Sequence, residues 1–162
     1  MTSSSSSINP NPSGFTDLDD VSWALTAINN LYVNGVINGK TDTLFYPNDS
    51  IIRAEFAKML VLAFNFDTVS ADTATFTDVP VSNWASEYVE AAYGNGIITG
   101  FDDGSFEPNS EITRQDMAVM VYRAATSAGY SIEDKTDEVT FTDDSIIAAY
   151  SKDAVSSLQK AN

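Results

Sequence analysis

The sequence contains no cysteine and no histidine among its 162 residues. Without cysteine there is no disulfide, no thiolate metal ligand and no thiol nucleophile. Without histidine, the usual acid–base group near neutral pH is missing. No apolar stretch approaches the ~20 residues that a membrane-spanning helix needs. These absences remove thiol chemistry, disulfide-stapled folds and membrane insertion from the functions to be considered.

Basic residues are also scarce. Lys and Arg together number 8, against 23 Asp and Glu, which gives a net charge of -15. Nucleic acids and anionic membrane surfaces are therefore unsuitable partners, because both are bound through clustered basic side chains. The hydrophobic fraction of 43% and the aromatic fraction of 11% are nevertheless typical of a globular protein.

What the sequence does contain is an internal repeat. The tripeptide Phe-Thr-Asp occurs at residues 15–17, 76–78 and 141–143. The first two copies align at a constant offset of 61 residues without a gap, and the third aligns with a one-residue insertion that places Tyr150 at the tryptophan position. Self-similarity at such a period indicates a tandem-repeat architecture.

The repeats divide the chain into six segments. In chain order we predict a Ser/Asn/Pro-rich linker (1–14), a first repeat (15–66), a connector (67–75), a second repeat (76–128), a second connector (129–140) and a partial third repeat (141–162). The third copy stops before its loop and second helix.

Each complete repeat predicts two helices joined by a loop. In the first repeat, Trp23, Ile28 and Leu31 belong to an apolar stripe on one face of a helix. The dipeptides 34–35 and 95–96, both Asn-Gly, supply the left-handed residue that ends such a helix. Two short helices cannot bury their apolar faces alone, so neighbouring repeats must share a core. The predicted fold class is all-α.

The motifs resemble those of the S-layer homology family. They are an opening Phe-x-Asp, a Trp-Ala helix, a Gly-Ile-Ile-x-Gly turn at 96–100, a Phe-x-Pro loop and a Thr-Arg-Ala-Glu-type helix start at 52–55 and 113–116. The resemblance spans residues 15–162. It implies a pseudo-threefold helical assembly that anchors a surface protein non-covalently to the bacterial cell wall. The location that it implies is extracellular, in the wall or surface layer.

The resemblance also implies a ligand. Family members bind an acidic secondary cell-wall polysaccharide, typically bearing pyruvate ketals, in grooves between adjacent repeats, with the motif arginine on the anionic group. Arg53 and Arg114 match that arginine and are the main candidate ligand-binding residues. In the first turn of a helix, an arginine beside free N–H groups makes an anion site. The alternative is a structural ion pair with Asp17, Asp78 or Glu55.

Two further pairs of repeated residues are candidates for the same ligand. Trp23 and Trp84 could stack on a sugar ring, although their place on the apolar stripe favours burial in the core. Gly39 and Gly100 could let a ligand approach the backbone, although a left-handed turn is the favoured interpretation.

The acidic pair Asp17 and Asp78 could touch ligand, but capping of the turn or helix that follows is the favoured interpretation. Thr113 and Asp116 resemble a capping box. Ile52 occupies the corresponding cap position in the first repeat and cannot accept a hydrogen bond. The cap expected there is Asn48, Asp49 or Ser50.

Metal and catalytic sites find little support. Residues 101–105 are acidic but lack the ligand order of an EF-hand, and no carboxylate pair stands out for glycoside hydrolysis. We therefore predict no metal, no cofactor and no enzyme. The leading function is binding of an acidic wall glycan. The alternative is a protein–protein assembly module in which another chain completes the third repeat, because the helix at about 151–158 has an apolar stripe and no partner helix.

Overall fold

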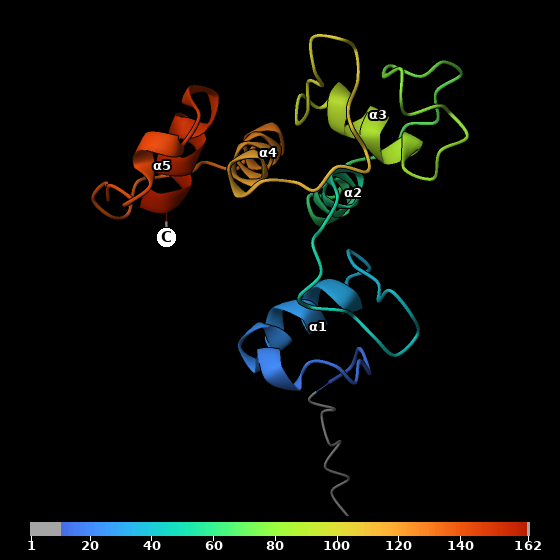
Figure 1. Cartoon of the computed structure of the whole chain (residues 1–162), viewed down its shortest axis with the longest axis horizontal. Helices are drawn as coiled ribbons and strands as arrows, with labels where there is room; N and C mark the ends of the chain where they lie inside the picture. Colours follow the sequence, from blue (N-terminus) through green and yellow to red (C-terminus); the bar gives the residue numbers. More distant parts are fainter. Residues whose placement is uncertain (1–10, 162) are drawn as a thin grey trace, which may run out of the picture. The chain divides into compact units, whose positions relative to one another are not determined.

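A computed structural model describes residues 11–161 (Figure 1). Its helices, in chain order, are η1 (Asp19–Ala24), α1 (Leu25–Val33), α2 (Arg53–Ala63), α3 (Ser86–Gly94), α4 (Arg114–Ser127), η2 (Asp144–Ile146), η3 (Ala149–Ser151) and α5 (Lys152–Lys160). Within residues 11–161 there is no strand, only an isolated antiparallel bridge between Ile52 and Glu111. The predicted all-α class is confirmed.

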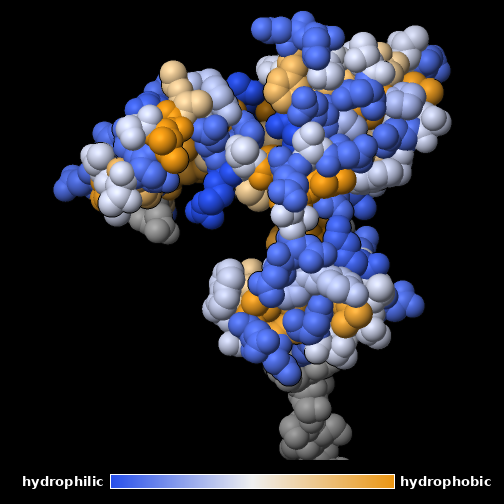
Figure 2. Space-filling view, in the orientation of Figure 1, coloured by the Kyte–Doolittle hydropathy of each residue, from blue (hydrophilic) through white to orange (hydrophobic). Residues whose placement is uncertain are grey.

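The chain forms two compact units, residues 1–49 and 50–162. The division falls inside the first repeat, so that α2 belongs to the second unit. No helix in the described part of the chain is long and apolar enough to cross a membrane. On the face seen in Figure 2, hydrophilic residues cover most of each unit and hydrophobic ones form separate spots, as the net charge of -15 leads one to expect.

The first unit is built around Phe15. Its ring lies 5.3 Å from that of Tyr32 on α1 and 5.5 Å from that of Phe45 in the loop, centroid to centroid. Ile28 and Val36 are buried beside this aromatic cluster. The loop is therefore fastened to the single α-helix of this unit by ring packing.

The second unit repeats this arrangement and adds helix packing. Phe76 lies 5.4 Å from Tyr93 and 5.5 Å from Phe106, which is fully buried. Helix α2 packs on α3 and α4, and α4 packs on α5. The core contains Val61 and Val89, both without exposed surface. The prediction that the last helix has no partner in the chain is wrong, since α4 fills that role.

Four helices end in the same way, and two of these ends were predicted. Gly35 and Gly96 have φ of 71° and 69° and follow α1 and α3. The N–H of Gly96 donates to the carbonyl of Tyr93 (2.9 Å), and that of Ile97 donates to the carbonyl of Ala92 (2.8 Å). This is the Schellman pattern, which satisfies the last carbonyls of the helix. Helices α2 and α4 end likewise, with Asn65 and Gly129 in the left-handed position.

The helix starts differ from the prediction. At α4 the Asp116 N–H donates to the Thr113 hydroxyl (3.2 Å), which is half of a capping box. The Asp116 carboxylate does not complete the box but accepts from the same hydroxyl (2.7 Å). At α2 the N-cap is Ile52, and Glu55 accepts from its N–H (3.2 Å). The caps predicted at 48–50 are wrong, because backbone carbonyls of the second repeat take their place.

Candidate ligand-binding groove

Arg53, the first residue of α2, has its backbone held by the loop of the second repeat. Its N–H donates to the carbonyl of Ser110 (3.0 Å), and the N–H of Ala54 donates to the carbonyl of Pro108 (3.0 Å). A site made of Arg53 plus free N–H groups was predicted, and this is wrong because both donors are used. What remains available to a ligand is the guanidinium.

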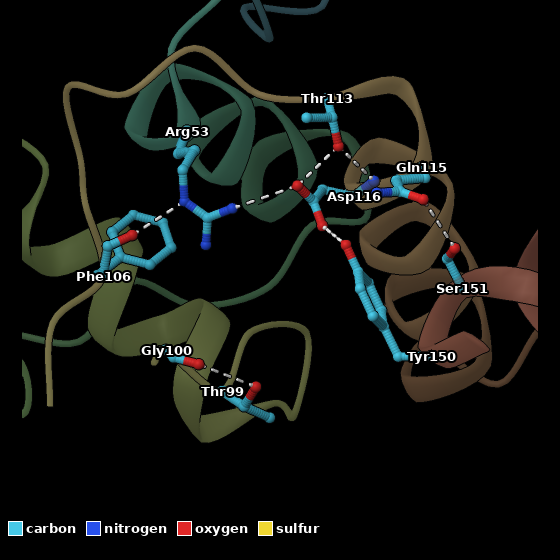
Figure 3. A network of polar contacts seen from close by, with 9 residues as sticks. All are labelled: Arg53, Thr99, Gly100, Phe106, Thr113, Gln115, Asp116, Tyr150 and Ser151. Atoms are coloured by element: carbon cyan, nitrogen blue, oxygen red, sulfur yellow. Dashed lines mark hydrogen bonds and ion pairs between the residues drawn. The ribbon is translucent and has the colours of Figure 1, made fainter. Parts of the chain in front are cut away.

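The Arg53 guanidinium is fixed on two sides (Figure 3). Its Nε donates to the carbonyl of Phe106 (2.9 Å), and its Nη1 lies 3.8 Å from Oδ2 of Asp116. Its central carbon lies 5.0 Å from the ring centres of Phe101 and Phe106, which is cation–π range. The ion-pair partner is therefore Asp116 and not Asp17, Asp78 or Glu55. The other terminal nitrogen, Nη2, has no partner within residues 11–161.

Asp116 joins the arginine to the third repeat (Figure 3). Its Oδ2 accepts from the Thr113 hydroxyl (2.7 Å), and its Oδ1 accepts from the hydroxyl of Tyr150 (2.6 Å). Partial burial of the phenol, together with this carboxylate as acceptor, raises the pKa of Tyr150 from 10.0 to about 12. A single polar network thus contains Arg53 from the first repeat, Thr113 and Asp116 from the second and Tyr150 from the third.

A groove of about 320 Å³ opens beside this network. Arg53 and Tyr150 lie on its walls, and the loop at 97–101 contributes the Thr99 hydroxyl and the Gly100 backbone. Helix α4 contributes one face, consisting of Asp116, Val119, Met120 and Arg123. All of these residues belong to the second unit. The volume lies at the lower end of the range of small-molecule sites in proteins.

The two repeated glycines differ. Gly100 lies in the groove and has φ of +72°, so the left-handed turn is confirmed there. Gly39 does not adopt a left-handed φ, and the turn interpretation is wrong for it. A Cβ on Gly100 would collide with the ring of Phe76, and a Cβ on Gly39 would collide with the ring of Phe15. Close packing of the aromatic ring is thus what both positions share.

Other predicted site residues lie outside the groove. Arg114 is exposed and makes no ion pair or hydrogen bond through its side chain within residues 11–161. Trp23 and Trp84 are exposed by 86% and 53%, so the favoured interpretation of both as core residues is wrong. The Lys58 ammonium lies 6.0 Å from the Trp84 ring. Of the two motif arginines, Arg53 is the one that lines this groove.

Asp17 and Asp78 fasten the Phe-x-Pro loops. Asp78 accepts from the N–H groups of Phe106 (2.9 Å) and Glu107 (2.8 Å), and Asp17 accepts from the matching pair in the first repeat (3.0 and 2.8 Å). The Phe45 N–H is the main reason that the pKa of Asp17 lies below its usual 3.8. Glu107 has φ of 58°, an unfavourable conformation that the carboxylate holds in place. Capping of the following turn was predicted and is wrong.

Several groove residues escaped the sequence analysis as ligand candidates, among them Phe101, Asp116 and Arg123. Phe101 and Arg123 occupy positions where the first repeat has Lys40 and Leu62, so a search for repeated residues passes over them. Asp116 was considered only as a cap. Arg123 could have been noticed, because it is one of only three arginines in an acidic chain.

Residues 11–161 contain no group of three or more acidic side chains placed to hold a metal ion. Asp116 is the one carboxylate among the residues that line the groove, and it is already hydrogen-bonded to Thr113 and Tyr150. What the groove offers chemically is a guanidinium edge, exposed aromatic rings and an apolar floor.

Comparison with known proteins identifies similar repeats. The family described as S-layer homology domain matches residues 14–57 and 75–118. An endoglucanase of Bacillus sp. (strain KSM-635) is 37% identical over 87% of the chain and 15% of its own length. The surface-layer 125 kDa protein of Lysinibacillus sphaericus is 35% identical over 80% of the chain and 11% of its own length. The cellulosome-anchoring protein of Acetivibrio thermocellus is 31% identical over 68% of the chain and 25% of its own length. The chain thus spans a quarter or less of each of these relatives.

Proposed function

The chain belongs to the S-layer homology family, and from this we propose that it anchors a surface protein to the bacterial cell wall by binding an acidic, pyruvylated polysaccharide. The predicted membership is confirmed by the match to both complete repeats. The predicted extracellular location, in the cell wall or surface layer, is confirmed with it, since matched relatives include a surface-layer protein and an anchoring protein.

The observation that carries the glycan proposal is the unused edge of Arg53. A guanidinium has five N–H donors in a plane, and here the Nη2 end faces the open groove (Figure 3). The contact to Asp116 at 3.8 Å is longer than a charge-assisted hydrogen bond, so it leaves the charge available. On a chain of net charge -15, this is a rare place for a carboxylate to bind.

The rest of the groove suits a sugar. Phe101 and Tyr150 are exposed by 46% and 59%, and their flat faces can cover the apolar side of a pyranose ring. The Thr99 hydroxyl and the backbone at Gly100 lie beside them as hydrogen-bonding groups. The ligand would thus have its acidic group on Arg53 and its ring against an aromatic side chain.

We further propose that the chain has no catalytic activity of its own. Glycoside hydrolysis requires two carboxyl groups on opposite sides of the scissile bond, and the groove has one. The catalytic activities named for relatives belong to proteins of which this chain matches a small part. Incubation with purified peptidoglycan and wall polysaccharide should release no reducing ends. Release of reducing ends by the purified chain above the level of a protein-free control would contradict this proposal.

Isothermal titration with wall polysaccharide tests the glycan proposal. We expect the native polymer to bind and the chemically depyruvylated polymer not to bind. Arg53→Ala should reduce affinity by at least 10- to 100-fold, the loss of a charge-assisted hydrogen-bond pair. Arg114→Ala is the matched control, because it removes the same charge from an exposed side chain outside the groove. Equal losses for both variants would contradict a specific role for Arg53.

A second proposal, assembly with another chain, has one observation in its favour. Phe141 is 41% exposed, whereas its counterparts Phe15 and Phe76 are 3% and 4% exposed beneath their loop aromatics. Another chain that supplied a Phe-x-Pro loop would cover it. Light scattering should then report a dimer at micromolar concentration, and Phe141→Ser should dissociate it. A monomer at every concentration tested would exclude this assembly.

A further inference from the structure

Arg123 is the groove residue that the motifs do not account for. It lies on α4 with Asp116, Val119 and Met120, at spacings of three, four and seven residues, which place all four side chains on one face of a helix. Seven residues correspond to about 10 Å along the helix axis. Since Asp116 contacts Arg53, the two arginines approach the groove from points separated along α4.

The charge of Arg123 is not balanced within residues 11–161. Its one polar contact is the hydrogen bond from Nη1 to the carbonyl of Ile97, which at 3.5 Å is long. No carboxylate lies within ion-pair distance of it in the described part of the chain. A half-buried cation with one weak hydrogen bond is a costly arrangement unless another group completes it.

The groove as a whole is therefore cationic. It contains the guanidinium groups of Arg53 and Arg123 and the single carboxylate of Asp116, a net charge of one positive unit. The chain around it carries -15. Asp116 offsets part of the charge of Arg53, whereas no carboxylate within residues 11–161 offsets that of Arg123. An acidic group that binds at Arg53 therefore leaves Arg123 without an anionic partner.

We propose that Arg123 is a second anion-binding residue, and that the groove recognises two acidic groups carried on successive units of the glycan. This inference rests on the proposed function and specifies its ligand. The separation along α4 favours two acidic groups over one shared carboxylate. Val119 and Met120 lie between the two arginines and give the groove an apolar floor for the linking sugar.

The competing explanation is structural. Ile97 directly follows the Gly96 turn that ends α3, and a cation near a helix C-terminus is stabilising. If this were the whole role of Arg123, its replacement would lower the stability of the second unit and leave ligand preference unchanged. A structural role therefore predicts a change in stability, whereas a binding role predicts a change in ligand preference.

The repeat itself supplies the test substitution. Arg123→Leu installs the residue that the first repeat has at the matching position, Leu62, and is a tolerable change on a helix. The probes are two synthetic glycosides: a pyruvylated N-acetylhexosamine with one carboxylate, and its disaccharide with two. Titration calorimetry measures their affinity, and thermal unfolding checks the fold. Arg123→Lys and Arg114→Ala are the controls.

We expect the unmodified chain to bind the disaccharide about 10- to 100-fold more tightly than the monosaccharide. Arg123→Leu should remove that advantage and leave monosaccharide affinity within about twofold, whereas Arg53→Ala should weaken both probes. Arg123→Lys should retain part of the advantage, and Arg114→Ala all of it.

Three results would overturn the inference. The first is an unchanged disaccharide preference in Arg123→Leu, which leaves the proposed function standing if Arg53→Ala still abolishes binding. The second is an equal loss for both probes together with a lowered unfolding temperature, which identifies a structural role. The third is that neither probe binds the unmodified chain, in which case the proposed function fails as well.

Discussion

The opening helices of the first and second repeats have matching sequences but different surroundings. In the second unit α3 lies against α2, and Ala85, Val89 and Ala92 have no exposed surface. In residues 11–49 of the first unit α1 is the one α-helix, and the counterparts Ala24 and Leu31 are partly exposed. The hydrogen bonds from the Phe-x-Pro loop to the aspartate of the Phe-x-Asp motif, and the left-handed glycine that ends the helix, are the same in both units. Local motifs therefore form without a helix partner, and Ile28 is buried without one, whereas full burial of the helix face requires one.

A charged residue introduced on the opening helix of each repeat should give the largest difference in stability loss between the two units. Ala92→Asp would bury an unpaired carboxylate under α2 and should cost the second unit several kcal/mol, about 3–5. Leu31→Asp, at the matching position of α1, should cost about 1 kcal/mol because water still reaches the site. Urea unfolding followed by Trp84 and Trp23, one in each unit, gives the two values. Equal losses would mean that α1 is covered as α3 is.

The helix-ending glycines should behave alike in the two units. Gly35→Ala and Gly96→Ala place a Cβ on left-handed backbone, and nothing lies within 4 Å of either Cβ. Each substitution should therefore cost about 1–2 kcal/mol through backbone strain alone. Urea unfolding followed by the fluorescence of Trp23 and Trp84 measures both losses. A much larger loss at Gly96 would show that the turn depends on neighbouring helices and would weaken the distinction between local and packed features.

The third repeat has a tyrosine where the first two have tryptophan, and this gives the smallest expected effect. The folded pKa of Tyr150, about 12, lies above the usual 10.0, so folding favours its protonated form. Its contribution to stability is complete below pH 10 and is lost as the pH rises towards 12. Ultraviolet titration should show a tyrosine that ionises near pH 12, which Tyr150→Phe removes, besides Tyr88, whose pKa burial also raises. Titration of all tyrosines near pH 10 would contradict the hydrogen bond to Asp116.

Much of the fold was predictable because its signals are local. The repeat, the helix pairs, the Asn-Gly stops and the place of Arg53 in the first turn of a helix all follow from short motifs and their spacing. The partners were not predictable, because they lie far along the chain. Arg53 contacts Asp116 in the next repeat, and the first turn of α2 is completed by the carbonyls of Pro108 and Ser110. No periodicity in a single sequence specifies such pairs.

The exposed tryptophans and Arg123 show two other limits. Helical spacing placed Trp23 and Trp84 on an apolar stripe, but each lies two residues before its α-helix begins, in a 3-10 segment in the case of Trp23. Repetition drew attention to paired residues and away from Arg123, which occurs once. A site assembled from several repeats need not be made of the residues that the repeats have in common.

The way α2 begins has a practical consequence for cutting the molecule into pieces. A fragment that starts in the connector at 67–75 discards Arg53 and leaves the Pro108 and Ser110 carbonyls without their donors. A fragment that starts at Ser50 keeps α2, its hydrogen bonds and every residue that lines the groove. The part of the chain that packs together is thus offset by about half a repeat from the part that the sequence repeats.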